Sequence, residues 1–158
     1  MTEHDSRALK VDEQTLADVW DRHLAAEFAF HNIEDALATM TEDAYVLNVS
    51  VGTGGYSKAG VRDFYTRFLI PQLPPDIEVI PVARTIGVDH LVDEAVYRFT
   101  HSVQMDWFLP GVAPTGRRIE WDHVAIVKVK AGRVVGQWAQ PDLWGIYAQL
   151  TREQPAPN

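Results

Sequence analysis

The 158-residue chain is 46% hydrophobic, which suits one domain with a substantial core. Its formal net charge of -8, from 14 basic and 22 acidic side chains, repels nucleic acid and anionic membrane surfaces. Cysteine is absent, so disulfides, a thiolate nucleophile and cysteine-ligated zinc are excluded. The N-terminus has no apolar signal-peptide region, and no apolar run reaches the ~20 residues that span a bilayer. We therefore expect a cytoplasmic protein with no nucleic-acid or membrane partner.

We expect a flexible arm over residues 1–13, a single domain over 14–150 and a flexible tail over 151–158. The domain begins with apolar residues at three- and four-residue steps, the stripe of an amphipathic helix: Leu16, Val19, Trp20, Leu24 and Phe28.

Two more helices and one strand are expected before Pro75. Asn32 is a suitable N-cap for a short helix over residues 33–40, and the strand formers of residues 44–51 stop at a glycine-rich turn over 52–55. Ser57 caps the third helix, which ends before Pro71 because proline cannot continue a helix.

Beyond Pro75 the hydrophobic period changes from 3.6 to 2. This predicts strands over 77–86, 91–106, 116–130 and 132–140, with a loop over 109–116 that proline and glycine keep out of the sheet. Long strands twist and bend, so the sheet has a concave face. We predict an α+β fold: a cone-shaped barrel in which three N-terminal helices pack on a strongly curved, mostly antiparallel sheet, leaving a tapered cavity for a ligand.

Two motifs carry a family resemblance. Residues 114–119 (PTGRRI) precede the penultimate long strand, and residues 132–138 (GRVVGQW) are followed by Asp142 and by Gln149-Leu150. With the order of elements, they resemble the SnoaL-like, polyketide cyclase-like branch of the nuclear transport factor 2-like superfamily. The chain departs from that pattern where the usual glutamate is Gly136 and where a polar residue after the tryptophan is Ala139.

The resemblance implies that Asp142 is a general acid/base, as in the cyclases. A carboxylate raised in pKa by apolar neighbours could move a proton in the pocket. The alternative is structural, because Asp142 stands at the start of a short C-terminal helix and could be its N-cap.

His101 and His123 fall on neighbouring long strands. Counting by two puts His101 on the face of Tyr97, and His123 on the face of Trp121. A neutral imidazole in a pocket can accept or donate a proton near neutral pH, so both are candidate catalytic partners of Asp142. Each could instead be a hydrogen-bonded core residue.

Large aromatic side chains form the predicted pocket wall, suited to a flat hydrophobic ligand. Each of them could equally be ordinary core. The candidate ligand-binding residues are Trp20, Tyr45, Tyr65, Phe68, Tyr97, Trp107, Trp121 and Trp138.

We predict a cofactor-free enzyme, with no metal, that uses acid/base chemistry on a small hydrophobic carbonyl or cyclic compound by cyclisation, isomerisation or dehydration. The alternative is a non-catalytic ligand-binding or dimerisation module. The resemblance implies a homodimer through the sheet face under either hypothesis. Epoxide hydrolysis by an Asp–Arg–Asp set is disfavoured, because Arg98 is predicted on the face opposite Tyr97 and His101.

Overall fold

A computed structural model describes residues 13–152, so most of the predicted arm and tail lies outside the described residues. The first helix, α1 (Glu13–Leu24), continues into a wider π-helical turn, η1 (Ala25–Ala29), in which the Phe30 amide donates to the Ala25 carbonyl at 2.9 Å. The short helix α2 (Ile33–Ala38) follows, and the Asn32 side chain accepts from the Asp35 amide at 3.1 Å. The predicted cap is therefore confirmed.

A strand hairpin separates these helices from the third. Strand β1 (Met40–Asn48) pairs with β2 (Thr53–Tyr56), which the sequence analysis took as a turn. The reason is a close backbone approach: a Cβ on Gly54 would lie 1.9 Å from the Val46 carbonyl oxygen, so this strand needs glycine.

The third helix, α3 (Ser57–Phe64), packs on the hairpin and also widens into a π-helical turn, η2 (Tyr65–Leu69). A short 3-10 turn, η3 (Ile70–Gln72), ends it. The N-cap position is Tyr56 rather than the predicted Ser57, which is the first residue of the helix and accepts from the Gly60 amide at 3.3 Å.

Four further strands and a helix complete the chain: β3 (Glu78–Ile86), β4 (His90–Thr100), β5 (Arg118–Lys130), β6 (Arg133–Pro141) and α4 (Leu143–Thr151). Strand β4 ends at Thr100 rather than at the predicted residue 106. The Asp76 carboxylate accepts from the Thr100 amide at 3.0 Å and from its hydroxyl at 2.6 Å, so this amide does not bond to a neighbouring strand. His101 therefore begins the long loop to β5 instead of lying on the strand.

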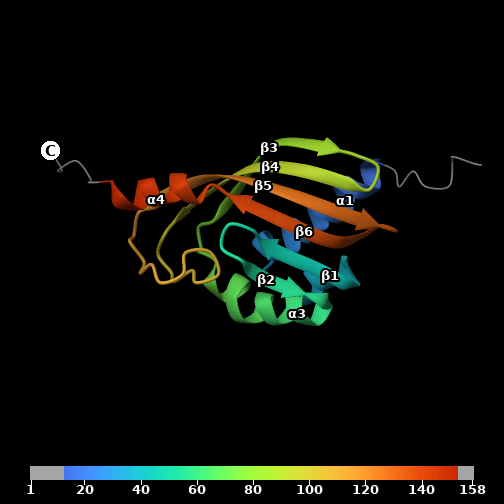
Figure 1. Ribbon diagram of the computed structural model, residues 1–158, viewed down its shortest axis with the longest axis horizontal. Coiled ribbons are helices and arrows are strands. Elements are labelled where there is room, and N and C mark those ends of the chain that lie inside the picture. The colour runs from blue at the N-terminus through green and yellow to red at the C-terminus, as the bar shows by residue number, and fades with distance from the viewer. Residues whose placement is uncertain (1–12, 153–158) are drawn as a thin grey trace, which may run out of the picture.

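The six strands form one sheet in the order β2-β1-β6-β5-β4-β3, antiparallel except for the pair β1 and β6. The fold is thus α+β with a mostly antiparallel sheet. The predicted closed, cone-shaped barrel is not confirmed, because β2 and β3 are the two edges of an open sheet. Helix α1 runs behind the sheet, α3 lies along β1 and β2, and α4 lies at one end (Figure 1).

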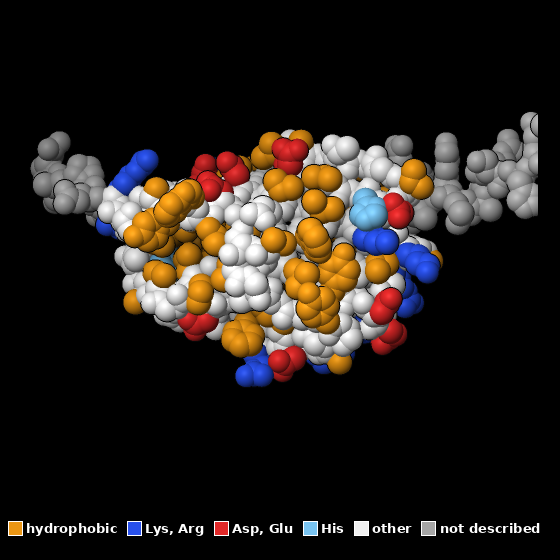
Figure 2. All heavy atoms as spheres, in the orientation of Figure 1, with side chains coloured by type: hydrophobic (Ala, Val, Ile, Leu, Met, Phe, Trp, Pro, Cys, Tyr) orange, Lys and Arg blue, Asp and Glu red, His pale blue; other side chains and the backbone are white. Residues whose placement is uncertain are grey.

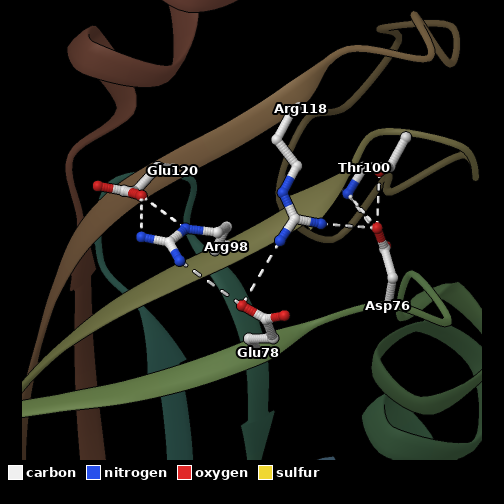
Figure 3. A network of polar contacts seen from close by, with 6 residues as sticks. All are labelled: Asp76, Glu78, Arg98, Thr100, Arg118 and Glu120. Carbon is white, nitrogen blue, oxygen red and sulfur yellow. Dashed lines mark hydrogen bonds and ion pairs between the residues drawn. The ribbon is translucent and has the colours of Figure 1, made fainter.

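The inner face of the sheet forms the core with α1 and α3. Strands β4 and β5 alternate buried and exposed positions, so that Tyr97, Phe99 and Trp121 point inward. Their neighbours point outward: Arg98 stands between Glu78 and Glu120 on adjacent strands, donating to Glu120 at 2.7 Å (Figure 3). This confirms that Arg98 lies on the face opposite Tyr97.

The outer face also carries exposed apolar groups. Ile126 and Trp138 are neighbours across β5 and β6, with exposed fractions of 45% and 50%, and Trp144 and Tyr147 are exposed on α4. Figure 2 shows hydrophobic side chains gathered over this side of the molecule. Among residues 13–152, no helix has the length and apolar character needed to cross a membrane.

Candidate active site in a buried cavity

A narrow cavity, partly open to solvent, lies between the inner face of the sheet and the helices. Its volume is about 30 Å³, measured as the space that the centre of a water molecule can reach, so its walls stand close together. Apolar and aromatic side chains form most of the wall, and four polar residues interrupt it. The lining residues are Glu27, Phe28, Val46, Asn48, Phe64, Leu69, Tyr97, Trp107, Phe108, Trp121, His123, Gln137 and Ala139.

Within residues 13–152, Glu27 is the only carboxylate in this lining. It comes from the π-helical turn η1 and is 1% exposed, and its Oε1 lies 3.1 Å from Nε2 of the fully buried His23. A carboxylate this deeply buried is costly unless it is paired. Oε1 has no aligned hydrogen bond, so it keeps a lone pair for a ligand.

His23 links Glu27 to its surroundings. Its Nδ1 lies 2.8 Å from the Thr39 hydroxyl, and its Nε2 lies 3.1 Å from the Tyr65 hydroxyl. Burial raises the pKa of Tyr65 well above its ordinary value, and the charge of Glu27 and its hydrogen bond to the hydroxyl act in the same direction. Tyr65 is therefore a neutral donor beside the carboxylate.

A second buried carboxylate, Asp93, lies on β4 and holds α1 against the sheet. It accepts from Trp20 Nε1 and from Arg84 Nε, each at 2.8 Å. The Trp20 ring, fixed in this way, stacks on the His23 ring at 5.3 Å. Both oxygens of Asp93 are thus occupied, so it serves as an anchor for the site.

His123 enters the cavity from β5. Its ring lies 4.6 Å from that of Tyr97, and Trp121 Nε1 donates to its Nδ1 at 3.5 Å. Burial lowers the pKa of His123 from 6.5 to about 4, while the charges of Glu27 and Asp93 act weakly against this shift. The imidazole is therefore neutral at pH 7, and with Nδ1 accepting, its hydrogen is on Nε2.

Two other buried polar atoms of the lining have no hydrogen-bond partner in residues 13–152: Trp107 Nε1, a donor, and Gln137 Oε1, an acceptor. Leaving such a group unsatisfied costs about 1–3 kcal/mol. They are therefore suited to a ligand that brings one acceptor and one donor.

Trp107 and Phe64 also border a second, outer hollow of about 400 Å³ beside β2 and α3. The two side chains thus separate this hollow from the cavity. The Trp107 carbonyl accepts from the Thr53 hydroxyl at 2.6 Å, which ties the loop to β2.

The three predicted catalytic residues are not brought together. His123 lines the cavity, whereas His101 is buried under its own loop, with Nδ1 3.1 Å from the Thr115 hydroxyl, and is outside the lining. Burial lowers the pKa of His101. Asp142 is exposed and accepts from the Gly145 amide at 3.0 Å, so it is the N-cap of α4 and does not reach the cavity.

The eight predicted wall residues also divide into groups. Tyr97, Trp107 and Trp121 line the cavity, and Phe68 borders the outer hollow. Trp20 and Tyr65 are buried outside the lining and bond to Asp93 and His23.

Tyr45 and Trp138 lie on the outer face, so their assignment to the wall was wrong. Strand β1 buries Ala44 and Val46, which turns Tyr45 outward. Its ring covers Gly136, where a Cβ would meet the ring at 2.0 Å. The position of the tyrosine ring therefore requires glycine at residue 136.

The sequence analysis missed Glu27 and His23, although a signal was present. His23 lies three residues after Trp20 and Glu27 seven residues after it, which places both on the apolar stripe of the first helix. Polar residues on a buried stripe require partners, and here they are each other's partners.

Comparison with known proteins agrees with this architecture. The family model described as SnoaL-like polyketide cyclase matches residues 13–150, so the chain belongs to the SnoaL-like polyketide cyclase family. No curated protein is detectably similar in sequence.

Solved structures show the same fold at low identity. A candidate SnoaL-like polyketide cyclase from Jannaschia sp. CCS1 is 17% identical, with a TM-score of 0.69, over 95% of this chain and 99% of that one. IdmH, a candidate polyketide cyclase from Streptomyces antibioticus, is 24% identical, with a TM-score of 0.65, over 86% and 98%. A protein of ketosteroid isomerase-like fold from Catenulispora acidiphila, in complex with trimethylamine, is 14% identical, with a TM-score of 0.65, over 87% and 98%.

Proposed function

We propose that the protein is an acid/base enzyme that moves a proton on a carbon next to a carbonyl group, with Glu27 as the base and His123 as the group that binds the carbonyl oxygen. One observation carries the proposal: a buried carboxylate and a neutral imidazole line the same aromatic cavity. Family membership supports a cyclase- or isomerase-like role on a small molecule.

The first step breaks the C–H bond, and Glu27 takes the proton. The electron pair of that bond forms the enolate, whose negative charge develops on oxygen. Nε2–H of neutral His123 and Nε1–H of Trp107 are the two donors suited to this oxygen. Such donors are effective in a cavity because little water competes with them.

The fate of the enolate decides the reaction. Its carbon can attack a second carbonyl of the same molecule, which closes a ring, or it can be reprotonated at a different carbon, which moves the double bond. If the carbon next to the enolate carbon carries a hydroxyl, loss of that hydroxyl as water gives dehydration. In each case Glu27 returns the proton, so the residues end the cycle as they began it.

The test uses 2-tetralone, a flat bicyclic ketone with acidic C–H groups next to its carbonyl. Proton–deuterium exchange in D₂O, followed by NMR, measures proton removal without the natural substrate. We expect Glu27→Gln to lower the exchange rate by at least about 100-fold, the scale of general acid–base catalysis. Asp142→Asn is the matched control for losing a carboxylate, and Asn still caps a helix. Wild-type exchange no faster than buffer, or equal loss in both variants, refutes the proposal.

A homodimer through the outer sheet face is proposed in addition, because Ile126 and Trp138 form exposed apolar neighbours there. Exposed patches of this kind mark association surfaces. Light scattering at micromolar concentration should give the dimer mass for the wild type and the monomer mass for Trp138→Lys. A wild-type monomer contradicts this.

A further inference from the structure

The proton positions around His23 can be worked out from its neighbours. The Thr39 hydroxyl has a single hydrogen, and it donates this to the Ala36 carbonyl at 2.6 Å. The same hydroxyl oxygen lies 2.8 Å from His23 Nδ1. With its hydrogen already engaged, Thr39 can only accept from His23, so Nδ1 carries a hydrogen.

This leaves Nε2, which lies 3.1 Å from both the Tyr65 hydroxyl and Glu27 Oε1. The contact with the Tyr65 hydroxyl has the geometry of a hydrogen bond, whereas Glu27 Oε1 has no aligned hydrogen bond. His23 and Glu27 are 0% and 1% exposed, so no solvent weakens the close contact between them. The imidazole, fixed by Thr39 at Nδ1 and by Tyr65 at Nε2, therefore limits where the Glu27 carboxylate can lie.

We propose that His23, with a hydrogen on Nδ1, is the positioning residue that holds the Glu27 carboxylate toward the cavity. This rests on the proposed function, because it concerns the carboxylate assigned there as the base. His123 is not part of this pair, because it lies on β5 and lines the cavity itself.

The surroundings suit such a role. The Trp20 ring stacks on His23 with an interplanar angle of 16°, a face-on contact that fixes the plane of the imidazole. Asp93, which fixes Trp20, contributes further negative charge, and Arg84 offsets it. The neutral hydroxyls of Tyr65 and Thr39 occupy the remaining contacts.

The tautomer is tested first, without any substrate. In the wild type, long-range proton–nitrogen NMR of the ring should show a hydrogen on Nδ1 of His23 at pH 7. Thr39→Val removes the acceptor, so the Nδ1 hydrogen signature should be lost. Thr41→Val, which removes a hydroxyl two residues further along, should leave it unchanged. A bare Nδ1 in the wild type, or no effect of Thr39→Val, overturns the inference.

The positioning role is tested by 2-tetralone exchange. His23→Phe should lower the maximal rate at least about tenfold while KM changes less than about threefold, since a group that acts on the base alters kcat and not uniform binding. His23→Gln, whose amide can donate to Glu27, should recover part of the rate. His90→Gln, an exposed histidine beside Asp89, is the control.

The outcomes separate the two proposals. If Glu27→Gln abolishes exchange and His23→Phe does not, His23 has no positioning role and the proposed function stands. If Glu27→Gln does not affect exchange, the proposed function fails. The NMR measurement then still shows whether His23 carries a hydrogen on Nδ1. A structural role alone predicts that His23→Phe lowers binding and rate together, in proportion to the folded fraction, and that result overturns the inference.

Discussion

The low pKa of His123 makes a quantitative prediction about stability. Burial shifts this pKa from 6.5 in an exposed imidazole to about 4 in the folded protein. Between these two values the unfolded chain binds a proton that the folded chain does not, so acidification favours unfolding. The contribution of His123 is complete above about pH 6.5 and is lost as the pH falls toward 4.

The size follows from linkage. One pKa unit corresponds to about 1.4 kcal/mol, and between pH 7.5 and pH 5.0 the full shift would lower the free energy of unfolding by about 2 kcal/mol. Because the side chain of His123 is only partly buried, solvent screening reduces this figure, and we expect about 1–2 kcal/mol.

Urea unfolding at the two pH values measures the loss. The carboxylates also begin to titrate in this range, so the informative quantity is the difference between the wild type and His123→Gln. The variant should lose about 1–2 kcal/mol less than the wild type. His31→Asn is the control, because His31 is exposed and its φ of 51° is one that asparagine tolerates. Equal losses in the wild type and His123→Gln would show that the imidazole is not held neutral by burial.

Two further predictions concern residues outside the cavity. Gly136→Ala should lower the free energy of unfolding, measured in urea, by about 1–3 kcal/mol, because its Cβ overlaps the Tyr45 ring. Adding Tyr45→Ala should recover part of this loss. No loss in Gly136→Ala would mean that the ring moves aside freely. Asp142→Ala should lower the free energy of unfolding by about 1 kcal/mol and Asp142→Asn by much less, because Asn still caps the helix. Neither substitution should change the rate of 2-tetralone exchange. Reduced exchange in the Asn variant would return Asp142 to the mechanism.

Hydrophobic periodicity predicted most of the elements. The helices, the change of period after Pro75 and the last two strands are where the pattern places them. The errors fall where tertiary contacts act. Strand β2 exists because its glycines allow a close approach to β1, and at the end of β4 the Thr100 amide bonds to Asp76 instead of to a strand.

The site was harder to predict than the fold, because alternation gives two faces and does not say which is buried. Tyr45 and Trp138 are as aromatic as Tyr97 and Trp121, yet the pairing of β1 with β6 places them on the outer face. For Asp142, the sequence allowed a cap or a catalytic group, and its contact with Gly145 supports the cap.

The two π-helical turns have a shared consequence for the site. Helix α1 widens at Ala25–Ala29 and α3 widens at Tyr65–Leu69. Glu27 lies in the first turn and Tyr65 in the second, and His23 bridges the two residues. π-Helical turns are rare and occur frequently at functional sites. Because both turns contribute to one buried polar cluster beside the cavity, the irregularity of each helix and the placement of the carboxylate have a common explanation. The wider turns allow the two helices to direct Glu27 and Tyr65 to the same imidazole.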